Sequence, residues 1–575
     1  MLKGIAAAPG ISIAKAFLLD SEEFVIQQRH IPEPELAEEI ARFEEALIKT
    51  RSEILNIQKK ITEEMEVEHA EIFNAHLLVL EDRMLIEEVI EHLKKEKVSV
   101  EYIFMEVLKK YMDIFSKIDD EYLRERIIDI GDVGKRVLKN LLGKQLETIK
   151  TQEEPVIVVA YNLSPSDTVT LHRKNITGFI TDVGGRTSHT AIIARSLRIP
   201  AVVGLENATK KIKNSDLLIL DGTEGTVIIN PDKQTLKKYI EQQKKQEEFR
   251  KRLLKLKNLP CETLDGHRIE LSANIEFPEE IPAVLQHGSE GIGLYRTEYF
   301  YMNRTDLPDE EEHFKSYKYV AQKMSPNPVI IRTLDLGGDK FVSQLNIPRE
   351  MNPFLGWRAI RFCLARPEVF KVQLRAILRA SHFGKLKIMY PMISGIEELK
   401  KANTILKEVK QELERKKIDF DEDIEVGAMI EIPSAALTCD ILAKEVDFFS
   451  IGTNDLIQYS LAVDRANEKI AYLYEPAHPA VLRLIKNIIE VAHDNGIWAG
   501  MCGEMAGEPH FALLLLGLGL DEFSVSPIVV PAIKNVIRSV KLEDVREFVR
   551  EALKLTSGKQ IEEFTKKFLK EVVSY

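Results

Sequence analysis

The first long pattern in the chain is a helical repeat of apolar residues. Between about residues 33 and 142, apolar positions recur three or four residues apart with Glu and Lys between them, as at Leu36, Ile40 and Phe43. This period is that of amphipathic helices, and the region contains almost no strand pattern. We therefore predict a bundle of about four helices within residues 21–143.

Short apolar runs replace the helical repeat on both sides of the bundle. Residues 144–231 contain several such runs, among them VIVVA and LLILD, and the first 20 residues contain more. Apolar runs of this length between turn residues are typical of buried strands. We predict a small α/β domain built from residues 1–20 and 144–231, with the bundle inserted into it.

A polar helical stretch follows, over residues 232–260. Its sequence, DKQTLKKYIEQQKKQEEFRKRLLKLKN and the next two residues, is rich in helix formers and largely lacks an apolar stripe. A helix of this kind usually bridges domains through solvent. We interpret it as a helical linker and place the main domain boundary there.

From residue 261 to the end, strand-like runs alternate with helical patterns, such as those over residues 353–364, 396–415 and 479–495. Eight βα units over about 300 residues are typical of a TIM (β/α)8 barrel. The predicted fold is therefore multidomain α/β, with a small N-terminal α/β domain that carries an inserted helical bundle and a C-terminal barrel over residues 261–575. The eight predicted strands are Ile269–Asn274, Gly291–Arg296, Val329–Leu334, Lys387–Pro391, Glu425–Glu431, Phe448–Gly452, Ile497–Cys502 and Glu522–Ser526.

Composition narrows the classes of function. A net charge of −12 disfavours nucleic acid as a partner, because phosphate backbones need clustered Lys and Arg, and it suits a small basic protein better. The four cysteines form no C-x-x-C pair, which disfavours a zinc site or a disulfide framework. No apolar run is long enough for a membrane helix, and no signal peptide is evident. We expect a cytoplasmic protein that does not enter a membrane.

Charged residues gather at the carboxyl ends of the predicted barrel strands, where catalytic groups of such barrels lie. Arg296 and Glu431 end predicted strands, and Arg332 lies near the end of another. Asn454 and Asp455 follow the sixth strand, in FFSIGTND. A lone arginine is usually a surface charge, and a lone carboxylate often caps a helix. Here each carboxylate directly follows an apolar run, which favours a site at the barrel rim.

The chemistry of these side chains indicates a small anionic substrate. Two carboxylates suit Mg²⁺, which keeps several waters and also binds substrate oxygens. Arg465, which follows soon after the sixth strand, is a further arginine of this group. An arginine side chain can bind a phosphate or carboxylate group through two parallel hydrogen bonds. Phosphoenolpyruvate carries both groups, and phosphoryl transfer depends mainly on positioning and charge neutralisation.

Two further residues have both a structural and a functional interpretation. Cys502, in AGMCGE, is either a small buried hydrophobe or a proton donor for an enolate at the rim. His189, in GGRTSHTAIIAR, is either a structural residue or a nucleophile at a helix N-terminus, where free N–H groups stabilise an anion. The adjacent Gly-Gly turn and the hydroxyl pair favour function for His189.

The two motifs together resemble the enzymes that use phosphoenolpyruvate. GGRTSHTAIIAR is similar to their phosphohistidine signature, and DFFSIGTNDLIQY is similar to their second signature. The chain has no room for the large ATP-binding domain of the dikinases and lacks the sensory domain of the nitrogen-related group. The inserted bundle resembles that of the sugar-system enzyme I, which docks the phosphocarrier protein HPr.

The resemblance implies a role for each residue. His189 is the phosphorylated intermediate, Cys502 protonates the enolate, and Thr168 orients His189. Glu431 and Asp455 hold Mg²⁺, the one cofactor implied. The family is homodimeric through the barrel. The residues implied to bind phosphoenolpyruvate are Arg296, Arg332, Arg358, Asn454, Asp455 and Arg465.

Two other functions stay open at this point. A barrel carboligase or lyase that acts on oxoacid enolates with Mg²⁺ would explain the barrel, but it would leave the His189 motif without a role. A regulator that only docks phosphocarriers would not need Glu431 and Asp455. A relay through His189 requires contact with two partners, so it predicts a rigid-body swing about residues 232–258.

Overall fold

The computed structural model divides the chain into two compact units, Met1–Glu248 and Phe249–Tyr575, each described here by itself. The division falls within helix α9 (Lys233–Leu254), the polar helix expected from the sequence. The structure describes residues 1–19, 26, 28–64, 76–77, 79–116, 121–143, 154–163, 175–185, 190–191, 194, 199–301, 306–336, 350, 352–465, 467 and 469–573.

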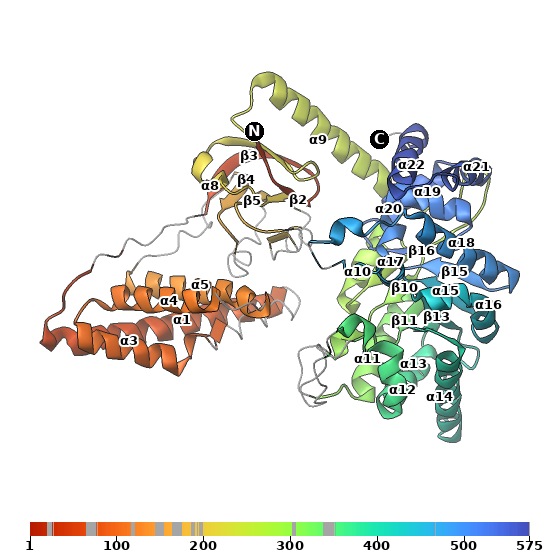
Figure 1. Ribbon diagram of the computed structural model, residues 1–575, viewed down its shortest axis with the longest axis horizontal. Coiled ribbons are helices and arrows are strands. Elements are labelled where there is room, and N and C mark those ends of the chain that lie inside the picture. Colours follow the sequence, from red (N-terminus) through yellow and green to blue (C-terminus); the bar gives the residue numbers. More distant parts are fainter. Residues whose placement is uncertain are drawn as a thin grey trace. The chain divides into compact units, whose positions relative to one another are not determined.

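A helical bundle forms one part of the first unit. Its helices run alongside one another in Figure 1, and their apolar stripes meet in one core that includes Phe43, Val89, Phe104 and Val137. The α3 helix begins at the N-cap Asp82, whose carboxylate accepts from the backbone N–H of Met84 at 2.8 Å. The bundle helices are α1 (Leu36–Glu64), α3 (Arg83–Glu96), α4 (Val100–Ser116) and α5 (Glu121–Leu141).

A mixed eight-stranded sheet forms the other part of this unit, in the order β1-β8-β7-β3-β4-β5-β6-β2. Strand β3 lies parallel to β4 and antiparallel to β7, so the first residues of the chain pair with strands that follow the bundle. Apolar clusters cover both faces of the sheet. Its strands are β1 (Leu2–Lys3), β2 (Ile5–Ala8), β3 (Ile11–Leu18), β4 (Val156–Ala160), β5 (Ile176–Thr181), β6 (Ala201–Val203), β7 (Leu217–Asp221) and β8 (Thr226–Ile229), with the short helix α8 (Ala208–Lys211) beside them.

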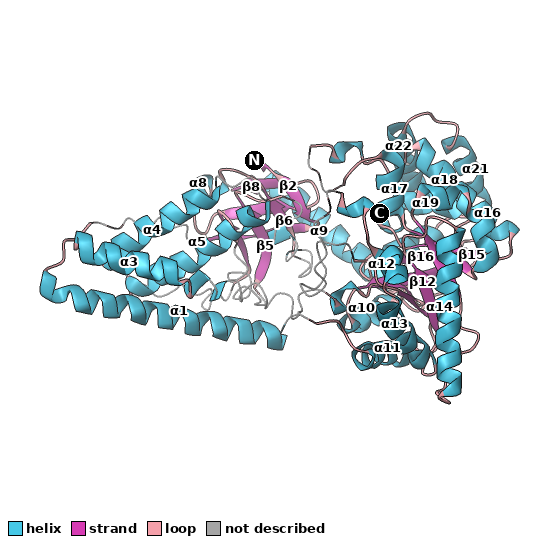
Figure 2. Cartoon of the chain, turned by 60° about the horizontal axis from the view of Figure 1, so that its bottom comes forward, coloured by secondary structure: helices cyan, strands magenta, loops and turns pink. Residues whose placement is uncertain are grey.

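The second unit is a closed barrel of eight parallel strands, as predicted. Strand β16 pairs with β9 in register and so closes the ring. Figure 2 shows the strands enclosed by helices, and one apolar core fills the layer between them. The strands are β9 (Glu270–Ile275), β10 (Ile292–Tyr295), β11 (Val329–Arg332), β12 (Leu386–Tyr390), β13 (Val426–Ile430), β14 (Phe448–Ile451), β15 (Trp498–Met501) and β16 (Glu522–Val525).

Helices alternate with these strands and continue after the last one. The segment predicted as helical over 353–364 differs, because α12 begins only at Ala359, which has φ 53°. Arg358 just before it is extended. The helices are α10 (Ile281–His287), α11 (Glu310–Met324), α12 (Ala359–Ala365), α13 (Pro367–Ser381), α14 (Ile396–Arg415), α15 (Pro433–Leu437), α16 (Cys439–Leu442), α17 (Thr453–Leu461), α18 (Pro479–Asp494), α19 (Pro509–Leu518), α20 (Val530–Arg538), α21 (Leu542–Ala552) and α22 (Gly558–Val572).

Candidate active site

The residues singled out at the strand ends lie at one mouth of the barrel. All eight strands are parallel, so their carboxyl ends meet at the same end of the ring. Arg332 ends β11, Glu431 follows β13, and Cys502 follows β15. Asn454 and Asp455 lie in the first turn of α17, directly after β14. The barrel closure therefore brings together side chains that are far apart in the sequence.

Asp335 joins two of the predicted arginines. Its carboxylate lies 3.0 Å from Nη1 of Arg332 and accepts from Nη2 of Arg358 at 2.8 Å. Arg332 also pairs with Glu298, and Nη2 of Arg358 lies 3.7 Å from the carboxylate of Asp455. Both guanidinium groups are largely buried and are held from more than one side.

These two arginines keep hydrogen-bonding capacity for a ligand. Burial opposes the charge of each, yet Glu298 and Asp335 outweigh it for Arg332 and raise its pKa. Asp335 and Asp455 do the same for the pKa of Arg358. Nε of Arg332 and Nε of Arg358 are buried without a hydrogen-bond partner among the described residues. Buried donors without partners cost free energy, and an anionic ligand would satisfy them.

Glu431 and Asp455 form a buried pair of carboxyl groups. Burial, followed by the charges of Asp455 and Asp335, raises the pKa of Glu431 well above its usual range. Burial also raises the pKa of Asp455, although Arg358 opposes the rise. One oxygen of Glu431 accepts from the backbone N–H of Met392 at 2.6 Å. When ionised, the pair therefore carries more negative charge than the nearby guanidinium groups offset.

A count of the buried charges around the mouth gives the same result. Four carboxyl groups, those of Glu298, Asp335, Glu431 and Asp455, are at most 16% exposed, and they face the two guanidinium groups. The buried carboxyl groups therefore outnumber the guanidinium groups by two. No three His, Cys, Asp or Glu side chains in the described part of the chain form a closed metal cage. Two carboxylates suit a hard divalent cation that keeps several waters.

Glycine makes the approach of Glu431 to α17 possible. A Cβ at position 452 would lie 2.7 Å from Oε2 of Glu431, closer than such contacts are found. Position 452 is the last residue before α17, so any side chain there would displace the carboxylate from Asp455. The GTND sequence thus combines a close backbone approach with the amide and carboxylate that follow.

Cys502 lies in the barrel interior, packed in a small apolar cluster with residues such as Met429 and Phe448. The Ser450 hydroxyl donates to its Sγ at 3.4 Å, and the Asn274 amide donates to its backbone carbonyl at 3.0 Å. Burial raises the pKa of the Cys502 thiol to about 11. The thiol therefore keeps its proton at neutral pH and is able to donate it.

The other predicted residues lie on the more exposed rim. Arg465 Nη1 and Asn454 Nδ2 each lie 3.3 Å from the same carboxylate oxygen of Glu504. The backbone N–H of Glu504 in turn donates to the side-chain Oδ1 of Asn454 at 3.0 Å. Arg296 pairs instead with Glu276. Among the described residues, no ion pair or hydrogen bond joins Arg296 to the cluster around Asp335. The structure thus brings most of the predicted set together and leaves Arg296 apart.

The partners Asp335, Glu298 and Glu504 are not identified by the sequence analysis. Asp335 lies in the loop just after β11, and Glu298 begins a short 3-10 helix (Glu298–Phe300) just after β10. Several polar residues follow each of these strands. The sequence does contain one indication of Asp335. This residue stands three positions after Arg332, close to the same strand end. Which of these polar residues turns toward the guanidinium groups depends on the loop conformation.

His189 and Thr168 lie outside the described residues. Some of the surrounding motif is described. Gly184 has φ 118°, a conformation that favours glycine, and Thr190 and Ala191 are helical. The role of His189 stays a prediction.

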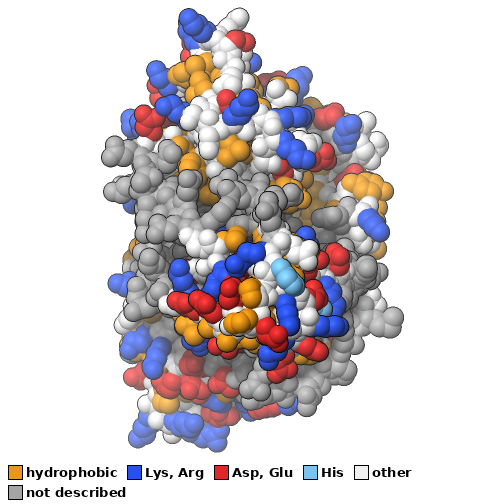
Figure 3. Space-filling model, turned by 90° about the vertical axis from the view of Figure 1, so that its left-hand side faces the viewer, with side chains coloured by type: hydrophobic (Ala, Val, Ile, Leu, Met, Phe, Trp, Pro, Cys, Tyr) orange, Lys and Arg blue, Asp and Glu red, His pale blue; other side chains and the backbone are white. Residues whose placement is uncertain are grey.

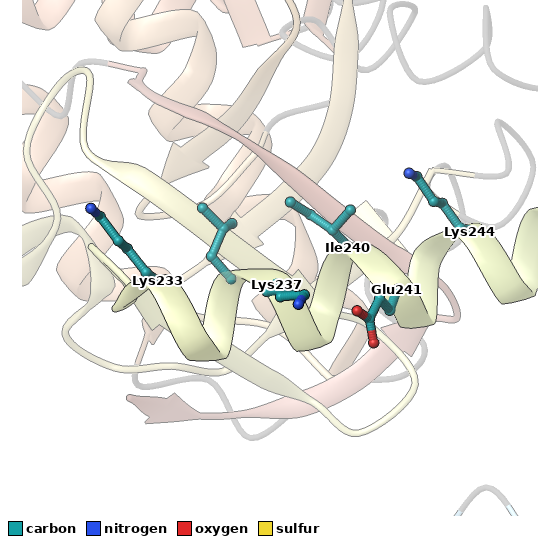
Figure 4. Close-up of a pocket in the computed structure, with 6 residues that line it drawn as sticks. Lys233, Lys237, Ile240, Glu241 and Lys244 are labelled. Atoms are coloured by element: carbon teal, nitrogen blue, oxygen red, sulfur yellow. The ribbon is translucent and has the colours of Figure 1, made fainter.

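A hollow along α9 has a different character from the barrel mouth. Lys233, Ile240 and Lys244 project from one side of the helix in Figure 4. All six lining residues belong to this single helix. Polar groups from separate elements do not converge there, as they do in a typical ligand site.

Comparison with known proteins covers each part of the chain. The sequence matches the family described as "PEP-utilising enzyme, PEP-binding domain" over residues 250–542. It matches "PEP-utilising enzyme, N-terminal" over residues 3–126 and "PEP-utilising enzyme, mobile domain" over residues 152–225.

Several relatives match along their whole length. The phosphoenolpyruvate-protein phosphotransferase of Priestia megaterium is 48% identical over 565 residues, which cover 98% of this chain and 98% of that protein. The protein of the same name from Bacillus subtilis (strain 168) is 46% identical over 569 residues, which cover 99% of this chain and 100% of that protein. A solution structure of Enzyme I (nEIt) is 47% identical and covers 43% of this chain and 100% of its own, with a TM-score of 0.38.

Proposed function

Because this chain belongs to the phosphoenolpyruvate-protein phosphotransferase family, we propose that it moves the phosphoryl group of phosphoenolpyruvate to His189 and then to a histidine of the phosphocarrier HPr. The chain is an enzyme of phosphoenolpyruvate-dependent phosphotransfer. The finer assignments below are proposals. The observation that carries them is the barrel mouth, where two buried arginines with unused donors lie beside two buried carboxyl groups.

The arginines account for substrate binding in this proposal. Arg332 and Arg358 donate to the phosphate and carboxylate of phosphoenolpyruvate, since their forks match planar oxygen pairs. Asp335 keeps both forks oriented before the substrate arrives. Asn454 and Arg465, both linked to Glu504, add contacts from the rim, and Arg296 adds another when it leaves Glu276.

Glu431 and Asp455 are the residues that would hold Mg²⁺. Their raised pKa values and the excess of negative charge around them fit a divalent cation. When bound, Mg²⁺ neutralises charge on the substrate oxygens. Glu431 is positioned for this by the Met392 N–H and by the absence of a side chain at Gly452.

The reaction then needs one nucleophile and one acid. An imidazole nitrogen of His189 forms a bond to phosphorus, while the bond between phosphorus and the enol oxygen breaks and leaves its electron pair on that oxygen. The Cys502 thiol donates its proton to the methylene carbon of the enolate, which gives pyruvate. Support for this role is the pKa of about 11, which keeps the thiol protonated.

We also assign the second half of the relay to the first unit. The helical bundle docks HPr, and the α/β domain that carries His189 swings about residues 232–258, so that His189 meets the barrel mouth and HPr in turn. Figure 3 views the bundle side, where acidic, basic and apolar side chains are interspersed. Ile48 on α1 and Met84 on α3 are exposed apolar side chains of the bundle, and a mixture of apolar and charged groups is typical of transient protein interfaces.

The remaining assignments concern assembly and place in the cell. We propose a homodimer formed through the barrel unit, which exposes Leu437, Tyr472 and Leu473. We also propose that the protein acts in the cytoplasm. None of the helices in the described ranges is both long enough and apolar enough to cross a membrane. The limits of the four predicted segments remain proposals as well.

A labelled transfer assay tests the proposal. With ³²P-phosphoenolpyruvate, Mg²⁺ and HPr, we expect label on HPr; EDTA should abolish it. Glu431→Gln should reduce the rate roughly 100-fold or more, because it removes one of two charged ligands, whereas Glu490→Gln on the exposed face of α18 should not. Label that stays on the enzyme would refute HPr as the acceptor. Unchanged transfer in EDTA would refute the metal assignment.

A further inference from the structure

A second cavity opens at the other end of the barrel, at the amino ends of the strands. Its volume is about 530 Å³, and its lining residues lie at or next to the starts of six strands. Five of the seven lining side chains are acidic, and only Lys387 is basic. The acidic members of this N-terminal acidic cavity are Glu270, Glu425, Asp447, Asp521 and Glu522.

Glu522 makes this more than a cluster of surface acids. It is 1% exposed, and neither carboxyl oxygen has a hydrogen-bond partner of good geometry among the described residues. It stands directly opposite Glu270 in the register of β16 and β9. Like charges opposite one another on neighbouring strands destabilise a sheet. The barrel therefore holds two carboxyl groups next to each other, on β16 and β9.

Two glycines give Glu522 its place inside the ring. A Cβ at Gly293 would lie 2.0 Å from one of its oxygens, and a Cβ at Gly500 would lie 2.2 Å from the other. These positions belong to β10 and β15, on either side of the β9–β16 pair. The room for a buried carboxyl group is thus built by three strands.

The local charges raise the affinity of this carboxyl group for a positive partner. Burial, followed by the charge of Glu270, raises the pKa of Glu522 to about 8, and the Ser272 hydroxyl and Lys387 offset only part of the rise. Burial also raises the pKa of Glu270, a rise that Lys387 and Arg268 oppose and the charges of Glu290 and Glu425 increase. A cation between the two would offset the charge of Glu270, which adds to the effect of burial on the pKa of Glu522.

The cavity already holds one ammonium group, that of Lys387. Its Nζ lies 2.9 Å from Glu425 and 4.6 Å from the centre of the Trp498 ring. The Trp498 Nε1–H donates to the same carboxylate at 3.2 Å. A carboxylate beside an aromatic ring is a typical ammonium site. Asp521 is engaged by His493 and by the Ala499 N–H, and one oxygen of Asp447 accepts from the Val426 N–H at 2.8 Å. Glu270, Glu522 and the other oxygen of Asp447 are left to receive a second ammonium.

The spread of the charges favours an organic cation over a metal ion. Within the described residues, no three potential ligands lie close enough together to hold a metal. The acidic groups instead extend from the buried Glu522 to the exposed Asp447. An extended ligand with separated charges fits this arrangement, and the volume is within the range of small-molecule sites.

We propose that the N-terminal acidic cavity binds a small linear diamine or polyamine, with one ammonium group between Glu522 and Glu270 and another at the acidic rim. The inference does not depend on the proposed function, because it concerns the opposite end of the barrel. The aliphatic part of such a ligand would lie along Trp498.

Calorimetric titration of the full chain tests the proposal. We expect 1,4-diaminobutane to bind saturably with a one-to-one ratio, and butylamine, which carries one ammonium, to bind roughly tenfold more weakly or worse. Glu522→Gln and Glu270→Gln should each weaken diamine binding roughly tenfold or more, whereas Glu543→Gln on α21 should not. Thermal unfolding of each variant separates a lost contact from a lost fold.

Three results would overturn the proposal. The first is no saturable binding of 1,4-diaminobutane up to about 10 mM, a range that corresponds to only a few kcal/mol. The second is equal binding by folded Glu522→Gln, by folded Glu270→Gln and by the unaltered chain. The third is displacement of the diamine by an equal concentration of Mg²⁺, which would identify a metal site.

Discussion

Replacement of Arg332 by lysine is expected to lower kcat/KM for phosphoenolpyruvate by roughly 10²–10⁴-fold. Lysine keeps the positive charge but not the planar fork, so it cannot hold Glu298 and Asp335 and also bind a phosphate with two parallel bonds. The loss should appear in kcat as well as in KM, because the arginine also stabilises charge that develops during transfer. Steady-state pyruvate release measures both constants.

Arg379→Lys is the matched control for this change. Arg379 lies on α13 in the same unit and contacts Glu310 and Glu311 at 2.6 Å each, but it belongs to the outer helical layer. We expect it to change kcat/KM by less than about twofold, because Arg379 is not among the residues at the barrel mouth. Arg332→Lys with nearly unchanged kinetics would show that the buried arginine cluster is structural.

Replacement of Cys502 by alanine is expected to lower kcat for pyruvate formation by roughly 10²–10⁴-fold, the usual contribution of a general acid. The thiol is the proposed proton donor, and its pKa of about 11 keeps it protonated through the neutral range. Loss of the thiol proton to solvent should therefore not limit the rate until the pH approaches that value. Steady-state assays and a single-turnover measurement of His189 phosphorylation locate the affected step.

Cys439→Ala controls for the loss of a buried sulfur. Cys439 is also buried, and its Sγ accepts from the Asn487 amide at 3.4 Å, away from the strand ends. A cavity from either change should cost a similar amount of stability. If Cys502→Ala keeps kcat within a few-fold of the Cys439→Ala value, Cys502 contributes only to packing of the core and another group supplies the proton.

The barrel could be predicted from the sequence because its strands are buried on both faces. VIIR, FFSI and WAGM are short apolar runs between helical patterns, and parallel strands covered by helices are expected to look like this. The predicted ends of the strands differ from the observed ends by a residue or two, because the last hydrogen bond of a strand depends on the neighbouring strand. The predicted helix over 353–364 was partly wrong, because the chain turns before Ala359 and so places Arg358 in the cluster.

The sequence predicts only those residues of the candidate site that directly follow a barrel strand. Glu431 and Asp455 follow apolar runs directly, so their position at the barrel mouth could be predicted from the sequence. Asp335 was not, because the ion pairs that give it a role join it to Arg358, 23 residues further along the chain. Glu522 was not either, since a charged residue at the start of a strand usually faces solvent. The buried position follows from two glycines on other strands.

The central claim is that the chain takes a phosphoryl group from phosphoenolpyruvate onto His189. Intact-mass analysis after incubation with phosphoenolpyruvate and Mg²⁺, on the unaltered chain and on His189→Ala, tests it most directly. The account predicts one added phosphoryl group on the unaltered chain only, labile in acid and stable in base, as expected for phosphohistidine. An unaltered chain without added mass, or a His189→Ala variant that still gains the group, would contradict it.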